Sequence, residues 1–263
     1  MFDQRSSPPA PALTARSLVK RFGGVAAVDG VSLDVPAGRI YGLIGPNGAG
    51  KSTLFDLIAG EQRPTSGGVA LGGVAVEREG ADRRLARGLG RTFQVPRPFS
   101  GMTLIENVML GAQGQSGEHM LPNWLQPGRV RRQEREARAR AMELLRFVDL
   151  EAHALNPARV LSGGQRKLLE LARALMAAPS LLLLDEPAAG VNPSLLAVIV
   201  DRIADINARG VAVLVIEHNL DVIARLCEHV FVMAAGKLLC EGAPGDVVRD
   251  ERVIEAYLGG APA

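Results

Sequence analysis

Short apolar runs separated by turn-forming residues occupy the first part of the chain. Over residues 13–35 the apolar and β-branched positions are interrupted at Gly23, Gly30 and, just beyond, Pro36. This pattern is typical of edge strands joined by turns. Arg39–Ile44 then forms a compact apolar run that predicts a buried strand.

A glycine-rich segment follows that strand, and the spacing of apolar residues then changes. Over 52–59 leucine and isoleucine recur on one side at helical spacing, so a helix is expected that stops at Gly60. From there to Gln94 the pattern indicates more strands.

Beyond Gln94 the pattern becomes mainly helical. A short helix is expected over 104–111, then glycine- and proline-bearing loops over 114–128. One long helical pattern with a single apolar stripe covers 129–150. Arginines crowd its polar face, and we interpret them as a solvated surface with ion pairs along the helix rather than as a lipid or nucleic-acid site.

The last third alternates strands and helices in regular order. After a helix over 164–177, the predicted elements are a buried strand over 181–184, a helix over 194–208, a strand over 211–216, a helix over 219–227, strands over 229–234 and 237–241, and a terminal helix near 251–258. The order predicts an α/β core interrupted by a mainly helical insertion at about 95–165.

The composition of the chain argues against several classes of protein. The 263 residues are 47% hydrophobic and carry a net charge of +2, which gives no reason to expect a nucleic-acid partner. Two cysteines are too few for a disulfide framework or a metal site. Residues 1–12 lack the apolar core of a signal peptide and are expected to form a disordered tail before one domain over 13–263. No apolar run reaches the length of a membrane helix.

One segment has the pattern of a phosphate-binding loop, a glycine-rich stretch that ends in Gly-Lys-Ser between a strand and a helix. Its glycines let backbone N–H groups turn toward phosphate oxygens, and the following helix adds its positive end. Lysine supplies a charge for the β- and γ-phosphates, and serine a hydroxyl for Mg²⁺. The predicted ATP-binding residues are Gly45, Pro46, Asn47, Gly48, Ala49, Gly50, Lys51, Ser52 and Thr53.

An apolar strand that ends in two acids, Asp185 and Glu186, would complete that site. The end of a buried strand holds a carboxylate rigidly, so Asp185 is expected in the Mg²⁺ shell. Glu186 stands one position on, where it could polarise a water molecule for attack on the γ-phosphate. A phosphate loop alone does not distinguish among kinases, GTPases, motors and transport ATPases.

The five residues Leu161, Ser162, Gly163, Gly164 and Gln165 narrow that choice. By themselves these residues indicate only the start of a helix with serine as its N-cap. Yet the segment resembles the signature motif of the ABC ATPase superfamily, and the acidic strand and a later histidine follow in family order. The resemblance implies a P-loop NTPase (RecA-like) core, with an N-terminal antiparallel β subdomain and an inserted α-helical signature subdomain. It also implies two subunits paired head to tail, each signature closing over ATP held by the other.

The same resemblance suggests further site residues. Phe22 matches the aromatic that stacks on adenine, Gln94 the glutamine that touches Mg²⁺ and the attacking water, and His218 the histidine that contacts the γ-phosphate. Lys51, Gln94, Glu186 and His218 are then the expected catalytic residues, and Ser52, Gln94 and Asp185 the Mg²⁺ contacts. Asn192 stands where many members have aspartate, which puts a salt bridge there in doubt.

Several stretches are similar to the ATP-binding subunits of branched-chain amino-acid importers. They are the segments 91–94 and 102–108, the run 185–193 and the ending 253–259. The similarity implies ATP and Mg²⁺ as cofactors. Its implied partners are a second ATPase subunit in a homodimer or a heterodimer, two membrane permeases and, indirectly, a periplasmic solute-binding protein. It places the chain on the cytoplasmic face of the plasma membrane.

Three alternatives remain open from the residues. The ATPase could serve lipopolysaccharide export or urea and amide import, or it could be a soluble ABC ATPase without a permease. An inactive regulatory subunit conflicts with the presence of Lys51, Asp185, Glu186 and His218.

Overall fold

The computed structural model describes residues 10–92, 97–114 and 127–258. The expected tail over 1–12 therefore falls largely outside the described residues, as does Gln94. Within these ranges, none of the helices combines the length and the apolar character that crossing a bilayer requires.

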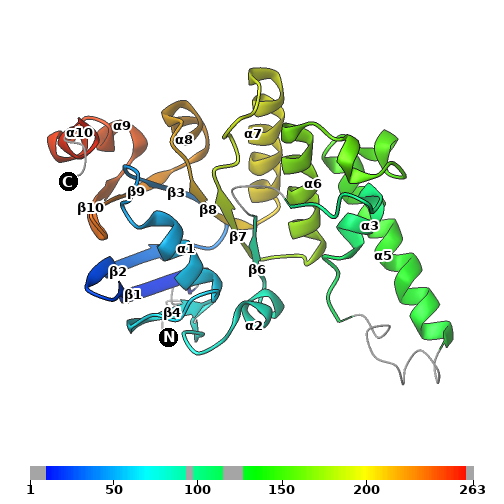
Figure 1. The fold of residues 1–263 in the computed structure, drawn as a ribbon, viewed down its shortest axis with the longest axis horizontal. Helices are drawn as coiled ribbons and strands as arrows, with labels where there is room; N and C mark the ends of the chain where they lie inside the picture. The colour runs from blue at the N-terminus through cyan, green and yellow to red at the C-terminus, as the bar shows by residue number, and fades with distance from the viewer. Residues whose placement is uncertain (1–9, 93–96, 115–126, 259–263) are drawn as a thin grey trace, which may run out of the picture.

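Two sheets form the core of the molecule (Figure 1). The first is antiparallel, with strand order β2-β1-β4-β5. Residues 13–35 supply the hairpin at one edge of this sheet, where the early apolar runs predict strands joined by turns. Its strands are β1 (Leu13–Phe22), β2 (Val25–Val35), β4 (Ser66–Leu71) and β5 (Val74–Ala75).

The second sheet has the order β10-β9-β3-β8-β7-β6 and is parallel except for β10, which pairs antiparallel with β9. Its strands β7 and β8 are buried along their whole length, as parallel strands covered on both faces must be. The bounds are β3 (Ile40–Ile44), β6 (Leu89–Arg91), β7 (Leu181–Asp185), β8 (Ala212–Ile216), β9 (His229–Ala234) and β10 (Lys237–Gly242).

Helix α1 (Lys51–Ala59) lies between the two sheets. Its apolar side chains, including Leu54 and Phe55, share one buried cluster with residues of both sheets. It ends as predicted at Gly60, whose φ of 80° closes the last turn. The loop between β3 and α1 is thereby fixed at the carboxyl ends of the parallel strands, where α/β sheets bind ligands.

The expectation of strands alone between Gly60 and Gln94 is wrong at one place. Residues Ala81–Ala86 form helix α2. The guanidinium group of Arg84 in this helix is fully buried and donates to the carbonyl groups of Leu57 and Ile58 at 2.6 and 2.7 Å. These carbonyls end α1 and lack partners in their own helix, so α2 is held in place as the cap of α1.

Helices gather at one end of the molecule (Figure 1). There α3, α5 and α6 pack against one another, with two short 3₁₀ turns between the last two. Ion pairs between Arg132 and Glu136 and between Arg140 and Glu143 confirm the solvated reading of the arginine-rich face. The elements are α3 (Leu104–Met109), α5 (Pro127–Phe147), η2 (Glu151–His153), η3 (Ala158–Val160) and α6 (Gly163–Met176).

The remaining helices cover the parallel sheet and the C-terminal end. They follow the predicted order, with one addition, the short helix α9, in a segment that had no predicted element. Their bounds are α7 (Pro193–Ala208), α8 (Leu220–Leu226), α9 (Pro244–Val247) and α10 (Glu251–Leu258). The alternating order of the last third is confirmed.

Candidate functional site

The phosphate loop requires glycine at its two tightest positions. Gly45 and Gly50 have φ values of 147° and 95°, in the region that side chains disfavour. A Cβ on Gly45 would lie 2.1 Å from the carbonyl oxygen of Met233, and one on Gly50 would lie 2.2 Å from that of Ala27. The loop is thus pressed against the backbone of β9 and β2, and larger residues cannot take these places.

The start of α1 is suited to hold an anion. Its N-cap is Gly50, which provides no side-chain hydrogen bond to the first turn. The first N–H groups of a helix have no acceptor within it, and their dipoles favour negative charge. Phosphate oxygens are the ligand that this geometry fits.

Lys51 follows the loop, and backbone carbonyl groups of the loop hold its ammonium group. Nζ donates to the carbonyl oxygens of Gly45 at 2.7 Å and Pro46 at 2.9 Å. Burial lowers the pKa of Lys51, while the nearby carboxylates of Glu186 and Asp185 oppose that shift. A phosphate bound here would supply the negative charge that favours the ammonium form.

Side chains from separate strands meet the loop around an open hollow of about 280 Å³. Glu186 follows β7 and His218 follows β8, and His218 Nε2 lies 2.8 Å from Glu186 Oε1. The sheet therefore brings the expected base and the expected histidine together. The hollow is lined by Ala27, Asn47, Gly48, Ala49, Gly50, Lys51, Ser52, Thr53, Glu186 and His218.

Glu186 has an unusual backbone. Its φ of 48° lies in the left-handed region, which costs a residue with a side chain about 1–2 kcal/mol. Such strain persists only where the surroundings fix it, and it gathers at functional sites. Here the N–H of Glu186 donates to the carbonyl of Ile216 at 2.9 Å, which ties the turn to β8.

Asp185 is buried at the end of β7, on the side of the site toward Arg91. Arg91 lies 3.8 Å from Asp185 and also pairs with Asp56 at 2.9 Å and Glu61 at 3.1 Å. Burial raises the pKa of Asp185, and Arg91 only partly offsets this. A buried carboxylate held in this way suits a divalent cation, whose charge would favour ionisation.

The signature residues stand apart from this hollow. The hydroxyl of Ser162 caps α6 by accepting from the N–H of Gln165 at 3.3 Å, and Gln165 Oε1 accepts from the N–H of Ser162 at 3.0 Å. Ser162 and Gly163 are exposed, while Leu161 is buried. A Cβ on Gly164 would lie 2.2 Å from Leu195, so this glycine allows α6 to approach α7.

The other predicted positions have varied surroundings. Phe22 ends β1 with half of its surface exposed, and the ammonium group of Lys20 lies over its ring at 5.1 Å from the ring centre. Asn192 caps α7, its Oδ1 accepting from the N–H of Leu195 at 2.9 Å. Gln94 lies outside the described residues.

Two residues that the sequence reasoning did not single out support the site. Buried Glu217 accepts from the N–H of Ala188 at 2.6 Å and from the N–H of His218 at 3.1 Å, so it joins the loops after β7 and β8. Tyr257 in α10 contacts Gly45. An acid directly before the histidine was a usable signal for Glu217, whereas no local pattern marks Tyr257.

Comparison with known proteins identifies this arrangement. A family model described as ABC transporter matches residues 28–189, more than half of the chain. The chain belongs to the ABC transporter family. The resemblance seen in the motifs is therefore confirmed, as is the fold class. A second model, described as branched-chain amino acid ATP-binding cassette transporter, matches residues 237–263.

Curated relatives of this ABC protein match nearly its whole length. A probable branched-chain amino acid transport ATP-binding protein LivG of Archaeoglobus fulgidus is 37% identical, over 94% of this chain and 95% of the relative. The high-affinity branched-chain amino acid transport ATP-binding protein BraF of Pseudomonas aeruginosa is 37% identical over 95% and 99%.

Solved structures show the same fold. A nucleotide-free ATP-binding cassette from an ABC transporter superimposes with a TM-score of 0.82, at 34% identity, over 94% of this chain and 98% of that one. A dimeric cassette in a post-hydrolysis state, bound to ADP and Pi, superimposes with a TM-score of 0.73 at 25% identity, over 88% and 98%. The predicted ABC ATPase is thus supported by both sequence and structure.

Proposed function

We propose that this ABC ATPase binds and hydrolyses ATP at two sites shared between paired subunits, and that hydrolysis drives import of branched-chain amino acids. One observation carries the proposal. The hollow that contains the phosphate loop, Glu186 and His218 contains no signature residue, whereas Ser162 and Gly163 are exposed elsewhere on the described part of the chain. A second subunit would supply the missing side of each site.

The residues of the hollow have complementary roles in this proposal. The glycine loop and the start of α1 hold the phosphates, and Lys51 turns from the carbonyls of Gly45 and Pro46 toward the β- and γ-phosphates. Glu186 polarises the attacking water, and His218 contacts the γ-phosphate while fixing the Glu186 carboxylate. The exposed turn at Ser162 closes the partner's site with its hydroxyl and N–H groups.

Mg²⁺ fits the residues present. Ser52 lines the hollow, and Asp185 offers a rigid carboxylate at the adjoining strand end. Magnesium is ordinarily held by one or two protein oxygens together with phosphates and water, so these two side chains suffice. When bound, it would neutralise charge on the phosphates. Gln94 is proposed as a further contact.

The transport role rests on the relatives and on the C-terminal match. Several relatives are described as branched-chain amino acid transport ATP-binding proteins. By this analogy we propose a second ATPase subunit, two membrane permeases and, indirectly, a periplasmic solute-binding protein as partners, at the cytoplasmic face of the plasma membrane.

The decisive experiment is purification with the native partners, followed by ATPase assays in sealed vesicles. Leucine, isoleucine or valine with the solute-binding protein should raise ATP hydrolysis several-fold, and Lys51→Ala should abolish the increase. Stimulation by urea, amides or lipopolysaccharide instead would reassign the cargo. Recovery of the chain without any permease would contradict a transport role.

A further inference from the structure

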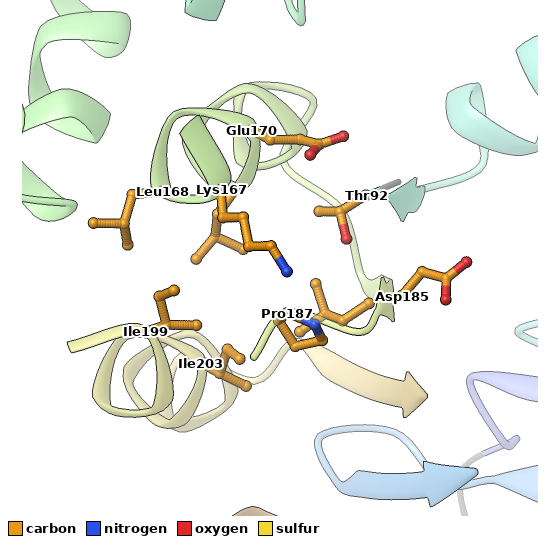
Figure 2. Close-up of a pocket in the computed structure, with 10 residues that line it drawn as sticks. Thr92, Lys167, Leu168, Glu170, Asp185, Pro187, Ile199 and Ile203 are labelled. Atoms are coloured by element: carbon orange, nitrogen blue, oxygen red, sulfur yellow. The ribbon is translucent and has the colours of Figure 1, made fainter. Parts of the chain in front are cut away.

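Lys167 contacts the backbone of the proposed base, Glu186, but has no role in the mechanism proposed above. It lies in α6, two positions after the signature glutamine Gln165, and its side chain points back into its own subunit. Its Nζ donates to the backbone carbonyl oxygen of Glu186 at 2.6 Å. In Figure 2 the Lys167 side chain extends from its helix toward the segment that carries Asp185 and Pro187.

The contact acts on the turn that orients the proposed base. The carbonyl of Glu186 also accepts from the N–H of Ala189 at 3.1 Å, so Lys167 and Ala189 together fix the direction of this peptide group. The Glu186 carboxylate is carried on this same turn, where φ is 48°, so we expect loss of the Lys167 bond to disturb its alignment with His218. A charged donor strengthens the carbonyl bond relative to a neutral one.

The surroundings of Lys167 combine partial burial with nearby carboxylates. Lys167 lines a small cavity of about 20 Å³, room for roughly one water molecule, and half of the residues around this cavity are leucine or isoleucine. Burial lowers the pKa of Lys167, and the carboxylates of Glu217, Glu186, Glu170 and Asp185 oppose that shift in decreasing order. A cation placed among acids and bonded to a carbonyl is thus a fixed point between α6 and the acidic strand.

Lys167 and Ser162 belong to one rigid element. They are five residues apart, which is about 7–8 Å along the helix axis. In the proposed dimer Ser162 contacts ATP bound to the partner, while Lys167 contacts the backbone of Glu186, the proposed general base of its own subunit. We propose that Lys167 is a positioning residue that links the placement of the signature helix to the orientation of Glu186. This inference rests on the proposed function.

The test compares Lys167→Met, Lys167→Arg and the parent chain. Methionine keeps the length and apolar stem but removes the donor. We expect kcat to fall about tenfold or more, with ATP affinity and Tm unchanged, because the nucleotide contacts persist. Arginine retains a donor and should restore much of kcat. Arg225→Met, which breaks an exposed ion pair with Asp201 on α7, is the matched control and should keep parental kcat.

Amide hydrogen exchange tests the effect of Lys167 on the turn without relying on ATP hydrolysis. Without nucleotide, amides of the segment 186–191 should exchange faster in Lys167→Met than in the parent or in Arg225→Met. Parental kcat and parental exchange in Lys167→Met would overturn the inference, as would a fall in kcat matched by lost ATP affinity or lower Tm. If the parent chain shows no more ATPase activity than Lys51→Ala, the proposed function fails. The hydrogen-exchange comparison would still test whether Lys167 holds the segment 186–191.

Discussion

The phenolic oxygen of Tyr257 accepts a hydrogen bond from the backbone N–H of Gly45 at 2.9 Å, across 212 positions of sequence. The carbonyl of the same glycine accepts from Lys51 Nζ at 2.7 Å. Gly45 therefore lies between the last described helix and the lysine of the phosphate loop. Burial raises the pKa of Tyr257, and the bond from Gly45 partly offsets this.

Tyr257→Phe should weaken ATP binding about fivefold, because one hydrogen bond contributes about 1 kcal/mol to the placement of the loop. Titration with a fluorescent ATP analogue measures the change. Ile254→Ala alters a partly exposed side chain of the same helix and serves as the control. Parental affinity in Tyr257→Phe would show that α10 does not support the loop.

Glu186→Gln should preserve ATP binding but lower kcat by at least about 100-fold, since the amide cannot accept a proton from the attacking water. The phosphate contacts remain, so ATP should trap the paired subunits. Size-exclusion chromatography with and without ATP would detect the trapped dimer. If this variant turned over at the parental rate, Glu186 would not be the base.

Ser162→Arg should bind ATP with parental affinity yet lose hydrolysis, because Ser162 is proposed to serve the opposite site. Lys51→Ala should also be inactive, for a different reason. Mixed in equal amounts, the two should regain up to roughly a quarter of the parental rate, since half the dimers are mixed and each has one intact site. Absence of any recovery, with mixed dimers demonstrated, would count against shared sites.

Asp185→Asn should raise Tm of the nucleotide-free chain by a few degrees at neutral pH. Burial raises the folded-state pKa of Asp185, so its ionisation disfavours folding above that pKa and has no effect below the ordinary carboxyl range. The gain should therefore shrink as pH falls. Arg91 keeps Asp56 and Glu61 as partners.

The same variant should lose Mg²⁺-dependent hydrolysis by at least about 100-fold, because an amide replaces the charged ligand. Thermal melts across pH, paired with ATPase assays, provide both measurements. A lower Tm at neutral pH would mean that the carboxylate stabilises the fold, contrary to its shifted pKa.

The sequence predicts most of the elements because their signals are local. The spacing of leucines and the glycine at position 60 predict α1, and Ser162 with Gln165 predicts the start of α6. Site residues follow strands of one parallel sheet, whose carboxyl ends meet at one edge, so the pairing of Glu186 with His218 could also be anticipated.

The misses depend on contacts that are distant in sequence or on unusual residue choices. From the sequence alone Arg84 would be assigned to the surface. Only the fold shows that it bonds to the C-terminal end of α1. The long helix expected to reach Leu150 ends at Phe147, because Asp149 takes a φ of 59° and the N–H of Leu150 donates to the carbonyl of Leu145 at 2.8 Å. Glycine is the usual residue for that stop, so aspartate conceals it.

The cap of α7 has a consequence for how the loop before it responds to solvent. Asn192 Oδ1 accepts from both the N–H of Leu195 and the hydroxyl of Ser194, each at 2.9 Å. An aspartate in this place would be screened by salt and neutralised by acid, but an amide neither titrates nor depends on counterions. The conformation at the start of α7 should therefore be the same at high and at low ionic strength.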